Sequence, residues 1–239
     1  MPQTYRSILV INTMHIGDLL LVTPALRTLR TNYPAAHIVL LTDKPLGDLV
    51  RCQPCIDELL LIDKHGKDKG ILALLRFIRR IRKRRFDLVI NLHRNERASA
   101  IAAFSGGRRI VGYSQPGFRR FFDQVVPNHA MADMPREESK HQVLCHFDVL
   151  REAVGVERID DRGLEMQIPP EADAEAGRLW QETFPEGKKI IGFNIGASWA
   201  TKRWLDDYFA SCADALLEEG CGVAFFGGPT DVPLVKVCL

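Results

Sequence analysis

The sequence predicts an α/β fold with parallel sheets, divided into two domains. Short, continuous apolar runs alternate with helical patterns along the chain, which is typical of strands covered on both faces in a doubly wound arrangement. A polar, proline-bearing stretch interrupts this alternation once, before it starts again. With 239 residues, of which 46% are hydrophobic and 26% charged, the chain is long enough for one large or two small domains.

The first part of the chain contains most of the alternating pattern. Its expected strands are short apolar runs at residues 7–12, 37–42, 58–62, 86–92 and 108–113. Its expected helices show apolar residues at helical spacing and cover residues 19–32, 46–51, 71–84, 98–104 and 141–156.

The stretch "ERIDDRGLEMQIPPEADAEAG" is the best candidate for a linker, because it is polar and contains Pro169-Pro170. We therefore expect domains at residues 1–168 and 169–239. The second should hold helices at 172–183 and 205–219, strands at 188–195 and 221–227, and the opening of a helix in "DVPLVKVCL". So few elements cannot cover both faces of a parallel sheet, so we expect an incomplete second domain and a chain truncated at its C-terminus.

The cysteines predict neither a disulfide framework nor a metal site. Six are scattered along the chain, and the one close pair, Cys52 and Cys55, lacks the second pair that a tetrahedral zinc site needs. The N-terminus has no signal-peptide pattern, and no apolar run reaches the roughly 18 residues of a membrane span. We expect a cytoplasmic protein.

The net charge of +2 hides one strongly basic segment, "RFIRRIRKRR", with seven basic residues between Arg76 and Arg85. A charge run on an amphipathic helix often only faces water. The alternative is a peripheral contact with the anionic inner face of the cytoplasmic membrane. Nucleic acid is not expected as a partner, because no aromatic stacking platform accompanies the charge.

The turn "TMHIGD" follows the first strand, at the edge where open α/β sheets carry their functional crevice. Gly17 would allow a tight turn there, and Asp18 falls at or near the start of the next helix. One interpretation of Asp18 is a helix cap that binds free N–H groups, and the other is a catalytic carboxylate. His93 and Arg94, at the end of another strand, should point toward the same crevice.

The turn "NIGASWATKRW" has the residues of an anion site. Small residues follow an apolar strand, Ser198 and Thr201 add hydroxyls, and Lys202 adds a cation near a helix start, a combination suited to phosphate or diphosphate. Neither the P-loop nor the dinucleotide-binding glycine pattern is present, so an ordinary loop remains the alternative.

A third turn, "GGPTD", ends the next strand. Its glycines allow close approach of the backbone, and Asp231 could accept from a ribose hydroxyl or simply cap a helix.

Five stretches together resemble the ADP-heptose:lipopolysaccharide heptosyltransferases of glycosyltransferase family 9. These stretches, in order over nearly the whole chain, are "ILVINTMHIGDLLLVTPALRTLRTNYP", "FDLVINLHRNERAS", "RRIVGY", "GASWATKRW" and "FFGGPTD". Within the family, the sequence most resembles the heptosyltransferase III branch, because of His15 in the first turn.

The resemblance implies a GT-B fold, in which two Rossmann-like domains bind the acceptor and the nucleotide sugar. It implies inverting transfer of heptose from ADP-heptose to a hydroxyl of the lipopolysaccharide inner core, without a required metal. A catalytically silent carbohydrate- or nucleotide-binding fragment is the alternative. A nicotinamide-dependent oxidoreductase is rejected, because the first turn offers one glycine where that fingerprint needs three.

The resemblance also assigns roles to individual residues. Asp18 matches the catalytic aspartate and would be the general base. Lys202 matches the lysine that binds the diphosphate, with Ser198 and Thr201 as hydroxyl donors and Asp231 near the ribose. The expected acceptor contacts are His15, Arg97, Arg119 and Arg120, the arginines because guanidinium groups suit phosphates and carboxylates; surface charge is the alternative for them.

Overall fold

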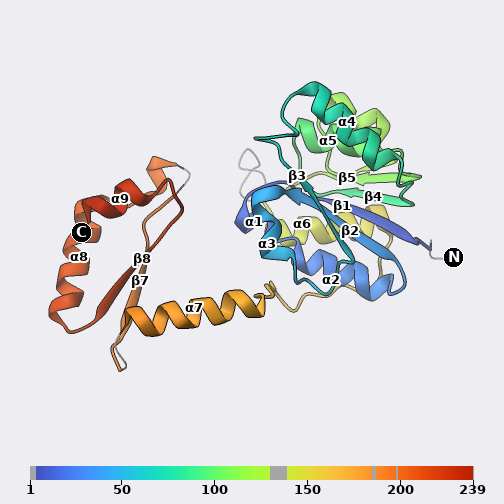
Figure 1. Ribbon diagram of the computed structural model, residues 1–239. Coiled ribbons are helices and arrows are strands. Elements are labelled where there is room, and N and C mark those ends of the chain that lie inside the picture. Colours follow the sequence, from blue (N-terminus) through green and yellow to red (C-terminus); the bar gives the residue numbers. More distant parts are fainter. Residues whose placement is uncertain (1–3, 130–138, 185–186, 198, 239) are drawn as a thin grey trace. The chain divides into compact units, whose positions relative to one another are not determined.

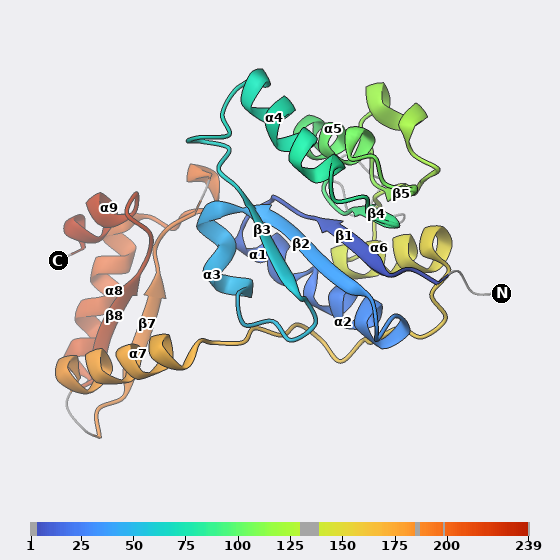
Figure 2. The ribbon, with the colours of Figure 1, turned by 45° about the vertical axis from the view of Figure 1, so that its right-hand side comes forward.

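The computed structural model describes residues 4–129, 139–184, 187–197 and 199–238 of the chain. They fold as two compact units, Met1–Pro169 and Pro170–Leu239, which are treated separately below. The two units appear in Figures 1 and 2, coloured along the sequence.

The first unit is built around a six-stranded parallel sheet with the order β3-β2-β1-β4-β5-β6. The sheet confirms the predicted α/β class, and β1 and β4 occupy its centre. Its strands are β1 (Ser7–Ile11), β2 (His37–Asp43), β3 (Glu58–Ile62), β4 (Leu88–Asn91), β5 (Arg109–Gly112) and β6 (Gln124–Val125). The two-residue strand β6 was not predicted, because so short a run carries no periodicity.

Helices cover both faces of this sheet, as the continuous apolar strands require. In β1, Ile8 and Val10 pack toward α2 and α6, whereas Leu9 and Ile11 pack toward α4 and α5, which lie side by side in Figures 1 and 2. The α-helices are α1 (Ile16–Leu20), α2 (Thr23–Asn32), α3 (Gly47–Val50), α4 (Ile71–Arg82), α5 (Glu96–Phe104) and α6 (Gln142–Asp148). Short 3₁₀ turns add η1 (Lys44–Leu46) and η2 (Pro116–Phe121).

The helix expected at residues 19–32 is two helices, α1 and α2. Pro24 lies in the first turn of α2, where its missing N–H is tolerated but where it cannot continue the ladder of α1. The first helix also begins earlier than expected, at Ile16. Asp18 is therefore the third residue of α1 and not its N-cap.

The helix expected at residues 141–156 is α6 followed directly by η3 (Val149–Val154), a stretch of π-helix. It ends at Gly155, whose φ of 82° is the left-handed conformation of a helix C-cap. The buried residues of this region pack on α2 and the central strands.

The segment expected to be a linker is attached to the first unit along α2. The buried guanidinium of Arg27 forms ion pairs of 3.2 Å with both Asp160 and Glu165, and it donates to the Gly163 carbonyl at 2.6 Å. Hydrogen bonds from Arg162 and, to a lesser extent, Arg27 hold the pKa of Asp160 well below its usual range. The polar side chains of this segment therefore form contacts that anchor it to the first unit, rather than leaving it a free linker.

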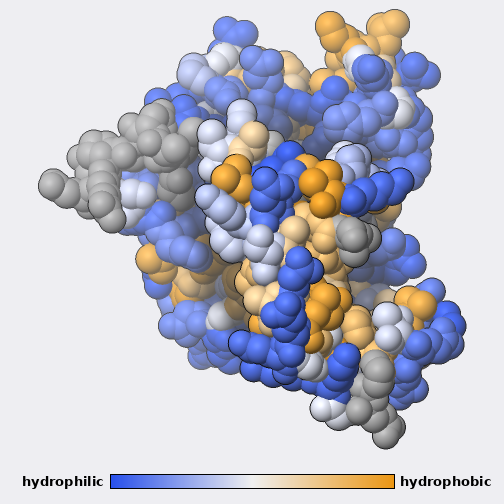
Figure 3. All heavy atoms as spheres, turned by 90° about the vertical axis from the view of Figure 1, so that its left-hand side faces the viewer, coloured by the Kyte–Doolittle hydropathy of each residue, from blue (hydrophilic) through white to orange (hydrophobic). Residues whose placement is uncertain are grey.

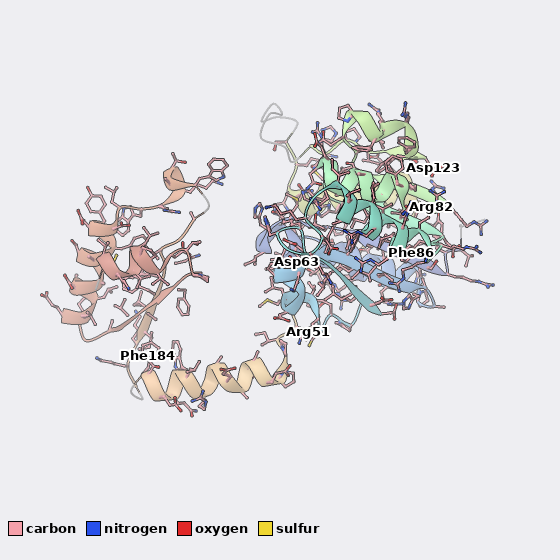
Figure 4. All side chains as sticks on the ribbon, turned by 45° about the horizontal axis from the view of Figure 1, so that its top comes forward. Arg51, Asp63, Arg82, Phe86, Asp123 and Phe184 are labelled. Carbon is pink, nitrogen blue, oxygen red and sulfur yellow. The ribbon has the colours of Figure 1, made fainter. Side chains whose placement is uncertain are left out.

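The second unit contains a two-stranded parallel sheet. Its elements are α7 (Pro170–Thr183), β7 (Ile190–Asn194), η4 (Ala200–Lys202), α8 (Asp206–Glu218), β8 (Gly222–Phe226) and α9 (Val232–Val237). Phe184, labelled in Figure 4, follows α7 and packs its ring on Trp180 at a centroid distance of 4.6 Å.

The second unit buries little apolar surface. Among its described residues only two hydrophobic side chains, Ile195 and Ala213, are fully buried. Large side chains such as Trp199, Trp204 and Leu205 are at least half exposed. Figure 3 shows orange hydrophobic side chains at the surface among the blue hydrophilic ones.

Replacing Arg27 with alanine should lower the free energy of unfolding by about 3 kcal/mol, because it leaves Asp160 and Glu165 without their shared buried cation. Urea unfolding is the measurement. Arg178→Ala is the matched control, since Arg178 pairs with Glu182 on the exposed surface of α7 and its loss should cost less than about 0.5 kcal/mol. Equal losses in the two variants would contradict the anchoring role.

Candidate functional site

The carboxyl ends of β1 and β4 place two polar loops beside each other. These strands are paired neighbours at the centre of the sheet, and both run toward the same edge. The loops are joined by a hydrogen bond of 2.9 Å between Thr13 Oγ1 and His93 Nδ1. This edge therefore brings together residues that are 80 positions apart in the chain.

Asp18 lies in this edge with a partly exposed carboxylate. Its Oδ2 accepts the backbone N–H of His15 at 3.4 Å and lies 3.5 Å from His15 Nδ1. This is the reach-back contact of a capping box, in which the third helical residue binds the N-cap backbone. The Asp18 side chain is 29% exposed, so solvent or a ligand can reach it.

Gly17 does not form the expected tight turn. It lies inside α1 without a left-handed φ, and a Cβ added there would meet no atom within 4 Å. The expectation of a turn glycine is therefore wrong. The absence of a side chain leaves open space beside Asp18.

His93 is held as a neutral ring between Thr13 and Asn95. Asn95 Nδ2 lies 3.0 Å from His93 Nε2. Burial, together with the nearby charges of Lys64 and His15, lowers the pKa of His93 to about 4, although Asp18 acts to raise it. A neutral imidazole can accept or donate a hydrogen bond without adding charge to the site.

Lys64 is a cation at this edge that the sequence did not single out. Its Nζ binds Asp43 Oδ2 at 3.0 Å and donates to the backbone carbonyl of Thr13 at 3.3 Å. Asp43 ends β2, and Lys64 follows β3, so the contact depends on strand order. In the sequence the residue is one of several lysines in "KHGKDKG", with no signal that separates it from the others.

The expected acceptor arginines lie at opposite ends of α5. Arg97, in its first turn, donates to the Asp68 carbonyl at 3.0 Å and lies at the carboxyl edge. Arg119 and Arg120 belong to η2, whose Phe118 packs on Phe104 at the last turn of α5. The nine residues of α5 separate these ends by about 13 Å, so the structure does not bring the pair to Asp18.

In the second unit, the turns after β7 and β8 are in contact. A Cβ added to Gly196 would clash with the carboxylate of Asp231, so a larger residue there would require this carboxylate to shift. Asp231 Oδ2 also accepts the Gly228 N–H at 2.8 Å. The Asp231 carboxylate therefore stabilises the turn "GGPTD" by a hydrogen bond. It also lies against Gly196, the first small residue of "GASWATKRW".

Thr201 and Lys202 lie exposed in η4, beside this junction in the sequence. Lys202 forms no ion pair with any residue that the structure describes, which leaves its ammonium available to an anion. Arg203 is fastened to the same turn through a 3.0 Å hydrogen bond from Nε to the Ala197 carbonyl. Ser198 lies outside the described residues.

Two further observations concern the described part of the chain. It contains no group of three or more histidine, cysteine, aspartate or glutamate side chains arranged to hold a metal ion. None of its helices combines the length and apolar character needed to cross a membrane.

The low pKa of His93 predicts a pH-dependent stability. The unfolded chain binds this proton near pH 6.5 but the folded chain only near pH 4, so stability is full above 6.5 and is lost as the pH falls toward 4. His93→Gln should reduce the slope of unfolding free energy against pH between 6.5 and 5, by up to about 1.4 kcal/mol per pH unit. Urea unfolding at several pH values measures this slope. His65 is exposed, so His65→Gln is the control and should leave the slope unchanged. Equal slopes for His93→Gln and the unsubstituted chain would refute the burial argument.

Comparisons with known proteins place the chain among sugar transferases. Lipopolysaccharide heptosyltransferase 3 of Escherichia coli is 27% identical over 225 residues, which cover 90% of this chain and 61% of the relative. Lipopolysaccharide heptosyltransferase 1 of Pseudomonas aeruginosa is 21% identical over 232 residues, covering 90% and 59%. The chain thus spans about three fifths of the length of these curated relatives.

Solved structures agree in fold. The glycosyl transferase family 9 protein from Veillonella parvula is 33% identical, with a TM-score of 0.86, and the match covers 99% of this chain and 67% of that one. E. coli ADP-heptose heptosyltransferase II, at 19% identity and a TM-score of 0.71 over 97% and 67% of the chains, shares the fold. A family model described as glycosyltransferase family 9 (heptosyltransferase) matches residues 74–237, more than half of the sequence. The chain therefore belongs to glycosyltransferase family 9, the heptosyltransferases.

Proposed function

We propose that this protein is an inverting glycosyltransferase that moves heptose from ADP-heptose to a hydroxyl of the lipopolysaccharide inner core, in the cytoplasm. The observation that carries the proposal is the partly exposed Asp18 carboxylate at the carboxyl edge of the first sheet, in a member of the heptosyltransferase family. The first unit would bind the acceptor and the second the nucleotide sugar.

In the proposed reaction, Asp18 is the general base. The acceptor oxygen attacks the anomeric carbon as the bond from that carbon to the diphosphate oxygen breaks, and the acceptor proton passes to the carboxylate. A carboxylate can do this because the hydroxyl becomes acidic only as the new bond forms. A single displacement of this kind inverts the anomeric centre.

The neighbours of Asp18 suit this role. His93 is neutral, so it does not neutralise the base as an ion-pair partner would, and Thr13 and Asn95 fix its ring. The open space beside Gly17 leaves room for an acceptor hydroxyl to approach. Lys64 holds the loop that begins with Thr13 and adds positive charge for an anionic acceptor.

Acceptor contacts are proposed for two groups of residues. His15 and Arg97 lie at the same edge as Asp18 and would contact the sugar that is modified. Arg119 and Arg120 would reach only parts of the acceptor farther away, because they lie in the part of η2 whose Phe118 and Phe121 pack on Phe104 at the last turn of α5.

Donor contacts are proposed in the second unit. Lys202 would bind the diphosphate and stabilise the negative charge that develops on it as it leaves, with Thr201 and Ser198 as hydroxyl donors. Asp231 would accept from the ribose. With this lysine and the helix-start N–H groups supplying positive charge, the proposal requires no metal.

A catalytically silent fragment that binds carbohydrate or nucleotide is the second candidate. It is favoured by the small buried core of the second unit. Incubation with ADP-heptose and heptose-deficient lipopolysaccharide separates the two candidates, since only the enzyme releases ADP.

Asp18→Asn should lower kcat by about 100- to 10,000-fold, because the amide cannot take the acceptor proton. ADP release by the complete protein is the measurement, with a thermal melt to show that the fold is kept. Asp48→Asn, an exposed carboxylate on α3, is the control and should leave kcat unchanged. A kcat for Asp18→Asn within threefold of the natural value would remove Asp18 as the base.

Lys202→Ala should weaken binding of ADP by about 10- to 100-fold, the effect of losing one hydrogen bond to a charged group. Calorimetric titration with ADP measures this. Lys188→Ala removes an equally exposed lysine from the opposite end of β7 and should leave the affinity as it is. If both variants bind ADP alike, the diphosphate contact lies elsewhere.

A further inference from the structure

Helix α4 has a second apolar side, which is largely exposed. Its inner face is buried under the sheet through Ala73, Phe77, Ile78 and Ile81. On the outer face, Ile71 is 78% exposed, Leu72 74% and Leu75 49%. Three large apolar side chains within five residues form an exposed apolar patch. The solvent-facing side of an amphipathic helix is normally polar instead.

The second half of the same outer face is basic. Arg76, Arg79, Arg82 and Lys83 form no ion pair with described residues, whereas Arg80 is paired with Asp68 at 3.2 Å. The sequence contains no acidic residue between Gly70 and Phe86. Ion pairs with the described residues of the first unit therefore leave the positive charge of this face unneutralised.

Two hollows flank the ridge formed by Arg76 and Arg79. One, of about 510 Å³, is lined by basic residues of α4 together with Lys67 and Asp68; the other, of about 540 Å³, is lined by Leu72, Leu75, Arg82 and Phe104 as well as the ridge. Arg82, labelled in Figure 4, is the last residue of the helix. We call Leu72, Leu75, Arg76, Arg79, Arg82, Lys83 and Phe104 the α4 surface.

Helix η2 extends the α4 surface with the same chemistry. Phe118 and Phe121 pack on Phe104 at centroid distances of 6.1 and 5.0 Å. The guanidinium of Arg120 lies over the Phe121 ring, 4.9 Å from its centroid, next to the exposed Arg119. Apolar rings and exposed arginines thus continue from α4 across the end of α5.

The apolar end of the α4 surface lies toward the candidate active edge. A helix that follows a parallel strand runs back along the sheet, so Ile71 and Leu72 begin α4 near the carboxyl ends of the strands. The contact between Arg97 and the Asp68 carbonyl confirms that the segment just before α4 reaches this edge. A layer bound to the α4 surface would therefore lie beside the crevice that holds Asp18.

We propose that the α4 surface docks this protein on a membrane of anionic lipids. Unpaired arginines and lysine match the phosphate of the headgroups, and the leucines and Phe104 match the apolar layer just beneath them. Basic and apolar residues on one helix face are the composition of helices that lie in the interfacial plane. The inference goes beyond the proposed reaction, because it involves neither donor nor acceptor sugar.

Vesicle flotation tests the proposal. The chain should bind vesicles containing 30% phosphatidylglycerol, bind phosphatidylcholine vesicles at least tenfold less, and lose most anionic binding at ~0.5 M salt, where exposed charges are screened. Equal binding to both vesicle types, or binding to neither, would overturn the proposal.

Two variants of the α4 surface separate its charge from its apolar patch. The triple change Arg79→Gln, Arg82→Gln and Lys83→Gln should lower the partition coefficient on anionic vesicles by about 100-fold. Leu72→Ser with Leu75→Ser should lower it by about tenfold or more, by removing the apolar contact. Circular dichroism and a thermal melt check that the fold is kept, which is expected because all five side chains are exposed.

Matched controls carry the same chemical changes in the second unit. These are Lys188→Gln, Lys189→Gln and Lys236→Gln for the charge, and Leu179→Ser with Leu217→Ser for the apolar side chains, all at exposed positions. The controls should bind vesicles like the unsubstituted chain. If they lose binding as much as the α4 variants do, the attraction is a property of total charge and the docking surface is refuted. Self-association that Leu72→Ser with Leu75→Ser abolishes, without vesicle binding, would assign the patch to a second copy instead and equally refute it.

Discussion

Complete burial of β1 and β4 on both faces is the constraint from which the rest of the first unit follows. The residues from Ile8 to Ile11 and from Leu88 to Ile90 have no exposed surface. Polar side chains are therefore accommodated only at the ends of these two strands. Asn91 does so as a structural group: it is fully buried and its Nδ2 donates to the Tyr113 carbonyl at 2.7 Å. The polar edge around Asp18 is thus a product of the same pattern that forms the core.

The sequence was a good guide to the elements whose signal is local. The strand at residues 58–62 is found at its predicted bounds, and the alternation of apolar runs with helical patterns is confirmed by the parallel sheet. Local signals were insufficient where tertiary contacts or a proline intervene. Pro24 splits one apolar periodicity into α1 and α2, and the polar pattern of the segment near Asp160 could not reveal that the buried Arg27 holds it.

For the candidate site, sequence predicted the residues of the first turn and could not predict their partners. Asp18 was found because the strand end is recognisable in the sequence, but its contact with the His15 backbone depends on where α1 begins. Lys64 was not predicted as a site residue. Its hydrogen bond to the Thr13 carbonyl, 51 residues away, depends on the order of three strands in the sheet. Arg119 and Arg120 looked equivalent to Arg97 as exposed arginines, and only the packing of η2 on Phe104 separates them.

The fastening of Asp231 to Gly228, directly against Gly196, has a thermodynamic consequence for any anion that binds beside these turns. The turn after β8 is already fixed by this hydrogen bond, so its conformational entropy is lost when the chain folds and not when the ligand arrives. Preorganisation of this kind favours tight binding from few contacts. It also makes Gly196 a residue whose replacement would loosen both turns at once, although it has no side chain of its own to touch a ligand.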